Sequence, residues 1–199
     1  RTDVSFTYEP SGGGETNPAT TTITITGTND APVVSAPLTG VASEDGSAVT
    51  LDLLANATDV DSESLSITDI SSIPEDVGVT IDGTTLTLDP AAGNYSELAQ
   101  GETAEIVVTY TISDGADGSV EQTATLIVTG TNNAPTVDAV LTATIFEDDE
   151  AITTIDLLSG AADVDNGSVL SLQNITGLTD GLALDEGSIL SIDPLAFQS

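Results

Sequence analysis

Alternation of apolar and polar residues with a period of two recurs along the chain and predicts β-strands. Within residues 30–132 we expect strands at 33–41, 48–54, 64–70, 78–82, 85–89, 104–113 and 120–129. Val, Ile and Thr dominate these segments, and the phrases DGTT and SDGADG between them are typical of hairpin turns. We find no amphipathic helix of useful length. This pattern predicts an all-β fold, an antiparallel β-sandwich of immunoglobulin-like or cadherin-like layout with about 100 residues per repeat.

The same phrases return in the same order, which indicates tandem repeats. GTNDAP at 27–32 recurs as GTNNAP at 130–135, and LDLLANATDVD from Leu51 recurs as IDLLSGAADVD from Ile155. The first residues match the end of a repeat, because FTY and TTITITGTND correspond to VTY and TATLIVTGTNN. We therefore expect the last two strands of a preceding repeat in 1–29, a complete repeat in 30–132, and in 133–199 a repeat without its last two strands. Because the chain opens in mid-pattern, we expect it to be an internal piece of a longer protein.

Charge and composition narrow the chemistry. There are 33 acidic residues and one basic residue, Arg1, which gives a formal net charge of −32. Nucleic acid and anionic membrane surfaces are therefore poor partners, because both require clustered Lys and Arg. The absence of Cys and His excludes disulfides, thiol nucleophiles and Ser-His-Asp triads. Carboxylate, amide and carbonyl oxygens remain, and such ligands suit Ca²⁺ better than Mg²⁺.

The expected strand directions bring acidic loops to the linkers. The loop after the second strand, with Asp59 and Asp61 and also Glu63, lies at the same end of its repeat as Asn29 and Asp30. Residues two apart in an extended segment can point to one side, so the Asp59/Asp61 pair can share one ion. At the opposite end we expect Glu44, Asp45 and Asp89 to lie close to Asn132, Asn133, Asp163 and Asp165. The sequence therefore predicts a metal site at each linker, with Asp114 and Asp117 as secondary ligands only.

Five phrases together resemble a known group of repeats: GTNDAP, EDG, LLANATDVD, TYTISDG and ATLIVTGTN. In this order they are similar to the cadherin-like, VCBS-type repeats of giant bacterial surface adhesins and related RTX proteins. The resemblance covers essentially the whole chain. It implies Ca²⁺ at the linker Asn-Asp, the Glu-Asp pair and the Asp-x-Asp, together with an extracellular location on the bacterial cell surface and a role in cell adhesion and biofilms.

Three kinds of function can be compared: an extender, a ligand-binding module and an enzyme. We expect a calcium-stiffened extender whose partners are the neighbouring repeats, with distal domains reaching another cell surface and no direct membrane insertion. The alternative is a ligand-binding module for glycans or for homophilic contact. Glycan binding usually needs an aromatic platform, and three Tyr, three Phe and no Trp make a poor one. We expect no enzyme, because paired catalytic carboxylates need a shielded pocket.

The two linker phrases differ at one position. The change from Asp30 to Asn133 removes one formal negative charge but keeps a carbonyl oxygen. We therefore expect the second linker to bind one ion fewer, or to bind Ca²⁺ more weakly, unless Glu44 and Asp45 compensate.

Overall fold

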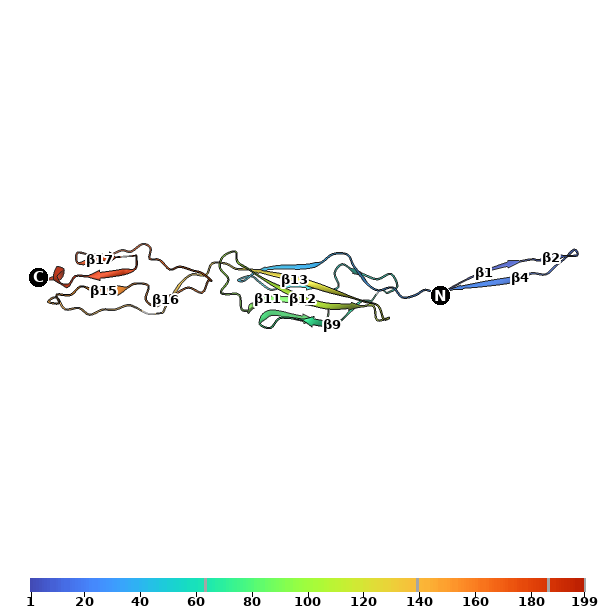
Figure 1. Ribbon diagram of the computed structural model, residues 1–199, viewed down its shortest axis with the longest axis horizontal. Helices are drawn as coiled ribbons and strands as arrows, with labels where there is room; N and C mark the ends of the chain where they lie inside the picture. The colour runs from blue at the N-terminus through green and yellow to red at the C-terminus, as the bar shows by residue number, and fades with distance from the viewer. Residues whose placement is uncertain (63, 139, 186, 199) are drawn as a thin grey trace. The chain divides into compact units, whose positions relative to one another are not determined.

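A computed structural model of the chain describes residues 1–62, 64–138, 140–185 and 187–198. It is almost entirely β-structure, with one short 3₁₀ helix, η1 (Pro194–Phe197) (Figure 1). No helix in these ranges is long and apolar enough to cross a membrane. The chain divides into two compact units, the first made of Arg1–Leu38, Asp52–Ile73 and Val108–Ala124 and the second of Thr39–Leu51, Pro74–Val107 and Thr125–Ser199.

The first unit begins with a long antiparallel hairpin. Strand β1 (Thr2–Tyr8) pairs with β4 (Ala19–Ile25), and the short strands β2 (Ser11–Gly12) and β3 (Glu15–Thr16) continue the hairpin to its tip (Figure 1). One face carries Val4, Phe6 and Ile23, each about half exposed. The two strands expected in 1–29 are thus present, and their membership of a preceding repeat stays a prediction.

The strand expected over 33–41 is wrong in its extent. The structure has two strands there, β5 (Val33–Val34), which pairs with β8 (Ala57–Thr58), and β6 (Leu38–Ser43), which belongs to a different sheet. Pro37 lies between them and explains the break. Proline lacks an N–H for the ladder and restricts the preceding residue, so one strand cannot run through this position.

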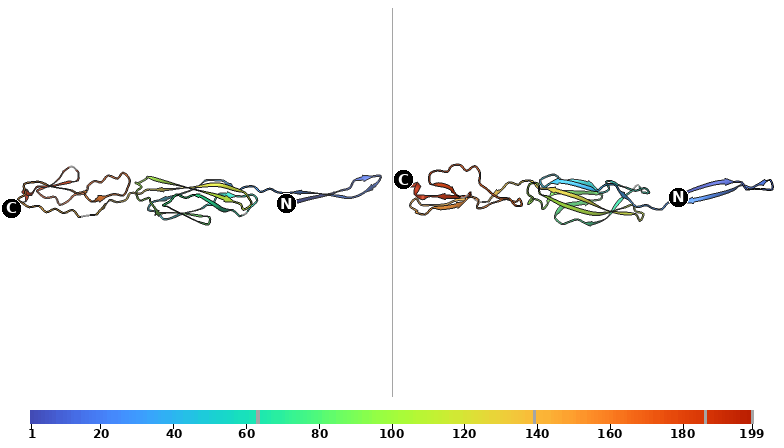
Figure 2. Two further views of the ribbon diagram at one scale, coloured as in Figure 1. Left: turned by 60° about the horizontal axis from the view of Figure 1, so that its bottom comes forward. Right: turned by 45° about the horizontal axis from the view of Figure 1, so that its top comes forward.

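The remaining strands of 30–132 form two sheets. One has the order β6-β13-β12-β9, and the other has the order β10-β11-β7. The new strands are β7 (Val49–Asp52), β9 (Ser66–Ser72), β10 (Val77–Asp82), β11 (Thr85–Gly93), β12 (Thr103–Ser113) and β13 (Ser119–Thr129). The pairings of β10 with β11, β9 with β12 and β5 with β8 are antiparallel, as the predicted β-sandwich requires. Figure 2 shows the long strands β12 and β13 side by side in two further views.

The core follows the predicted alternation. On β12 every second residue from Ile106 to Ile112 is buried, and on β13 the same holds from Ala124 to Val128. Leu86 and Leu88 of β11 are also fully buried. Complete burial of such an aliphatic side chain contributes about 1.5–3 kcal/mol, so these short rows supply much of the stability available to a domain of this size.

Residues 133–198 repeat part of this arrangement. Strands β15 (Thr153–Asp156), β18 (Ile189–Ile192) and β17 (Leu182–Asp185) form a sheet in the order β15-β18-β17, which corresponds to β7-β11-β10. The pair β14 (Thr136–Val137) and β16 (Ala161–Ala162) likewise corresponds to β5 and β8. Five strands of residues 30–132, namely β5, β7, β8, β10 and β11, therefore have counterparts here, whereas β6 and β9 have none among the described residues of 133–198.

Candidate metal centre

The first candidate site, here called the first junction, comprises Asn29, Asp30, Asp59, Asp61 and Asp114. The backbone N–H of Asp30 donates to Oδ2 of Asp61 at 2.7 Å. The Asp-x-Asp loop is folded on itself, because Oδ1 of Asp59 accepts the backbone N–H of Asp61 at 2.7 Å. The structure thus brings the linker and the Asp-x-Asp pair together, as the strand directions predicted.

Asp114 is more central to the first junction than the sequence indicated. Its carboxylate is only 8% exposed and accepts hydrogen bonds from Nδ2 of Asn29 at 2.7 Å and from the backbone N–H groups of Ala116 and Gly118 at 2.7 and 3.0 Å. The Asn29 amide, followed by the backbone donors, holds the pKa of the Asp114 carboxyl below its ordinary value. A Cβ at Gly118 would collide with this carboxylate, so a glycine there leaves the space that Asp114 fills.

One carboxylate oxygen of the first junction is unpaired. It is Oδ2 of Asp59, which is buried and has no hydrogen-bond partner among the described residues. A buried acceptor without a partner costs about 1–3 kcal/mol, and more when the group is charged. The arrangement therefore holds a desolvated carboxylate oxygen beside a linker that carries further oxygens on Asn29 and Asp30.

The second junction comprises Glu44, Asp45, Asn132, Asn133, Asp163 and Asp165, and it repeats the backbone geometry of the first. The N–H of Asn133 donates to both carboxylate oxygens of Asp165, at 3.3 and 3.0 Å. Oδ1 of Asp163 accepts the N–H of Asp165 at 2.9 Å, as Asp59 does for Asp61. Asp165 is 9% exposed. The same linker-to-loop contact thus occurs at both junctions.

Glu44 is the most buried acidic side chain of the second junction. It is 7% exposed, and its Oε1 accepts both the backbone N–H and the hydroxyl of Thr131, each at 3.0 Å. The same hydroxyl lies 2.6 Å from Oδ2 of Asp45, to which it donates in the alternative orientation. Oε2 of Glu44 is buried without a partner among the described residues, as is Oδ2 of Asp59 in the first junction.

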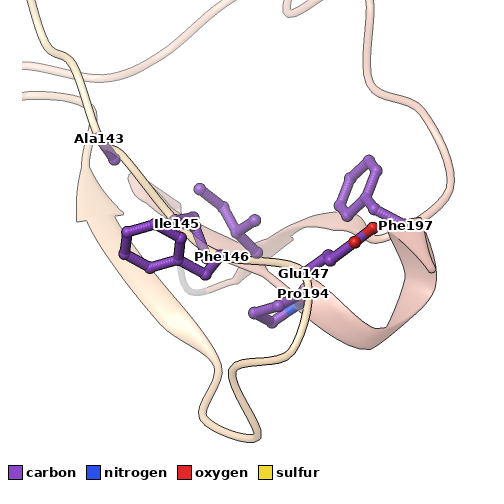
Figure 3. A pocket seen from close by; sticks show the side chains of 7 residues that line it. Ala143, Ile145, Phe146, Glu147, Pro194 and Phe197 are labelled. Carbon is purple, nitrogen blue, oxygen red and sulfur yellow. The ribbon is translucent and has the colours of Figure 1, made fainter.

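A cavity of about 400 Å³ opens beside Glu44. Asp45, Tyr95 and Asn133 also line it. Three residues of its lining, Glu44, Asp45 and Asn133, are predicted ligands. By contrast, the pocket of Figure 3 is lined by Ala143, Ile145, Phe146, Glu147, Ile192, Pro194 and Phe197, with a single carboxylate.

The other predicted ligands are less well placed. Asp89 lies in β11, where it accepts the backbone N–H of Ala91, and no hydrogen bond among the described residues joins it to the junction. Asn132 is exposed, and its amide donates to the backbone carbonyl of Asn133. Glu63 lies outside the described residues. No group of three or more acidic side chains in the described ranges is close enough to hold a metal ion, so amide and backbone oxygens would have to complete either site.

Comparison with known proteins gave one family. Residues 28–129 match the family described as Cadherin-like domain. No curated protein sequence matches the chain.

Several solved structures are similar over most of the chain. The structure of mouse clustered PcdhgC3 EC1-3 is 22% identical, with a TM-score of 0.44 over 96% of this chain and 65% of its own. Human desmocollin-1 is 17% identical, with a TM-score of 0.41 over 93% and 35%. An endo-fucoidan hydrolase from glycoside hydrolase family 107 is 18% identical, with a TM-score of 0.39 over 97% and 30%. The chain therefore spans between about a third and two thirds of the length of these proteins.

Proposed function

Because the chain belongs to the family of cadherin-like domains, we propose that it is a calcium-binding extender of an extracellular adhesion protein, with Ca²⁺ at the junctions between successive repeats. The parent protein is a bacterial surface adhesin of the RTX type, a proposal that the phrases resembling VCBS-type repeats support. The repeats are 1–29, 30–132 and 133–199, each the partner of its neighbour. The role is structural rather than catalytic.

The observation that carries the proposal is the pair of orphaned oxygens. Asp59 Oδ2 and Glu44 Oε2 are both buried without a hydrogen-bond partner among the described residues, and each lies in a junction that the sequence marks independently. The only basic side chain, Arg1, has its Nε 3.5 Å from Oδ1 of Asp3 and is thereby paired with another carboxylate. A cation from solvent is the counter-charge that the composition leaves available.

The donor set fits Ca²⁺. All candidate ligands are hard oxygens, and Ca²⁺ takes six to eight oxygens at roughly 2.3–2.6 Å from carboxylates, amides and backbone carbonyls. The candidate ligands are Asn29, Asp30, Asp59, Asp61 and Asp114 at the first junction, and Glu44, Asp45, Asn133, Asp163 and Asp165 at the second. In this arrangement at most two carboxylates of each set would hold one ion, and amide and backbone oxygens would complete its shell. When bound, Ca²⁺ supplies positive charge that offsets the repulsion among these carboxylates.

The protein's own hydrogen bonds account for the stiffening. The linker N–H of Asp30 is tied to the Asp59–Asp61 loop, and that of Asn133 is tied to Asp165. Neutralising the carboxylates removes the force that drives linker and loop apart, so these short contacts persist and the linker samples fewer conformations. This supports an array of repeats whose bending depends on Ca²⁺.

The test is thermal unfolding together with small-angle X-ray scattering, in EDTA and in millimolar Ca²⁺. With Kd about 10⁻⁴–10⁻³ M, one site in about 10 mM Ca²⁺ stabilises the folded state by about 1.4–2.7 kcal/mol, which raises Tm by roughly 5–20 °C for a domain of about 100 residues. A control variant, Glu105→Gln/Glu121→Gln, removes two exposed carboxylates from β12 and β13 and should respond to Ca²⁺ like the wild type. Identical melting and scattering with and without Ca²⁺ would refute the proposal.

A further inference from the structure

The two junctions share their backbone contacts but differ at one position of the linker. Asp30 and Asn133 occupy equivalent places, and the N–H of each donates to the second Asp of the Asp-x-Asp pair. The side chain of Asp30 is a carboxylate, which adds negative charge to Asp59 and Asp61. The side chain of Asn133 is an amide, which adds none and brings two N–H donors.

The amide of Asn133 is directed at the second junction's most buried acid. Its Nδ2 lies 3.4 Å from Oε1 of Glu44 and 3.3 Å from the backbone carbonyl of Ser96, and it donates to both. Asn133 is itself half-buried, so these bonds are partly shielded from water. The positive end of the amide dipole therefore faces Glu44. A carboxylate ligand at position 133 would instead place negative charge there.

Asn166 adds contacts of the same kind. It follows Asp165 in the chain, and its backbone N–H donates to the carbonyl of Glu97 at 2.8 Å. Its side-chain amide donates to Oε2 of Glu102 at 3.2 Å. Together with the bonds of Asn133, these contacts join residues 44–102 to residues 133–166 through neutral donors alone, without a cation.

We propose that Asn133 makes the second junction a latch that stays ordered without calcium. Its amide donates to Glu44 Oε1 and adds no charge, so the linker contact to Asp165 persists when Ca²⁺ is removed, whereas the unpaired Glu44 Oε2 stays available to the ion. At the first junction the Asp30 carboxylate repels Asp59 and Asp61, and the corresponding contact to Asp61 is lost. This regulation rests on the proposed calcium sites and is graded. As the Ca²⁺ concentration falls, the first junction loses its contact between linker and loop, while the second junction keeps its own.

The two equivalent amides are the probes. Hydrogen exchange measured by NMR gives protection factors for the backbone N–H of Asp30 and of Asn133 in the full chain, in EDTA and in millimolar Ca²⁺. We expect the Asn133 amide to be protected at least about tenfold more than the Asp30 amide in EDTA, and the two to approach each other in Ca²⁺. Equal protection of the two amides in EDTA would overturn the latch.

Substitutions separate the amide's bonds from its charge. Asn133→Asp should lower the protection at position 133 in EDTA by about tenfold and restore it in Ca²⁺. Asn133→Ala, which removes the donors without adding charge, should lower it less. Asn17→Asp adds the same charge to an exposed loop of the first unit and should change nothing. If Asn133→Asp leaves the protection in EDTA unchanged, the latch is wrong.

The same data distinguish this inference from the function on which it rests. If neither amide of the wild type gains protection on addition of Ca²⁺, the calcium sites are wrong and the graded response fails with them. If the Asp30 amide gains protection in Ca²⁺ but Asn133→Asp behaves like the wild type in EDTA, the calcium sites stand and only the latch is overturned.

Discussion

The side-chain amide of Asn29 donates a hydrogen bond to Oδ2 of Asp114 across 2.7 Å, although 85 positions separate the two residues in the chain. The contact joins the linker that follows β4 to the turn between β12 and β13. It also orients the side chain of Asn29. The amide nitrogen donates to Asp114, so the amide oxygen points elsewhere and is available to another partner. The first junction is thus assembled from three separate segments of the chain.

Gly118→Ala should disrupt this contact. A Cβ at position 118 would overlap the Asp114 carboxylate and approach Nδ2 of Asn29 to 2.9 Å. Displacing a buried, multiply bonded carboxylate should cost about 1–3 kcal/mol, measured by urea unfolding in EDTA. Gly12→Ala is the matched control, because a Cβ there meets nothing within 4 Å. Equal stability of the two variants would mean that the Asn29–Asp114 contact contributes little.

Tyr110→Phe should destabilise the core and change the alkaline limit of stability. The Tyr110 side chain is 1% exposed, and its hydroxyl donates to the carbonyl of Leu53 at 3.0 Å. Its loss leaves a buried carbonyl unpaired, at a cost of about 1–3 kcal/mol.

The sign of the pH effect follows from the pKa of Tyr110. Burial, and then the charge of Asp52, raise that pKa above its ordinary value of 10.0. A group whose pKa is raised on folding contributes stability below its unfolded pKa, and this is lost as the pH rises through the folded pKa. Wild-type stability should therefore fall above about pH 10, with a shallower fall in Tyr110→Phe. Parallel profiles of unfolding free energy against pH would contradict this.

Gly93→Ala should disturb the wall of the cavity beside Glu44. An added Cβ would overlap the ring of Tyr95, whose hydroxyl donates to the carbonyl of Val77 at 2.7 Å. The ring is buried and lines the cavity, so it cannot move without breaking this bond. We expect a loss of about 1–3 kcal/mol, read from the urea midpoint against Gly12→Ala. An unchanged midpoint would show that the ring relocates freely.

Much of the fold could be predicted because β-strands have a strong local signal. The alternation over 104–113 and 120–129 located β12 and β13 to within a residue. The same pattern failed at 33–41, where Pro37 divides two strands that the apolar residues alone would join. The expected third strand, 64–70, is displaced by two residues to Ser66–Ser72.

The candidate site was predicted only in part. Strand directions brought Asp30 to Asp61 and Asn133 to Asp165, and the structure confirms these contacts. Asp114 was predicted as a secondary ligand only, because Asp before Gly is a common turn former and its partner Asn29 is distant in sequence. The burial of Glu44 was equally hidden, since it depends on Thr131, which is brought near only by the pairing of the sheet.

The central claim is that the junction carboxylates bind Ca²⁺, and calorimetric titration of the whole chain measures this directly. The wild type should bind Ca²⁺ with Kd about 10⁻⁴–10⁻³ M, the range of extracellular calcium modules, and Mg²⁺ more weakly. The double variant Asp59→Ala/Asp61→Ala should no longer bind Ca²⁺ at the first junction. The control Glu105→Gln/Glu121→Gln should bind as much Ca²⁺ as the wild type. Absence of calcium binding by the wild type, or the same isotherm for Asp59→Ala/Asp61→Ala, would contradict the claim.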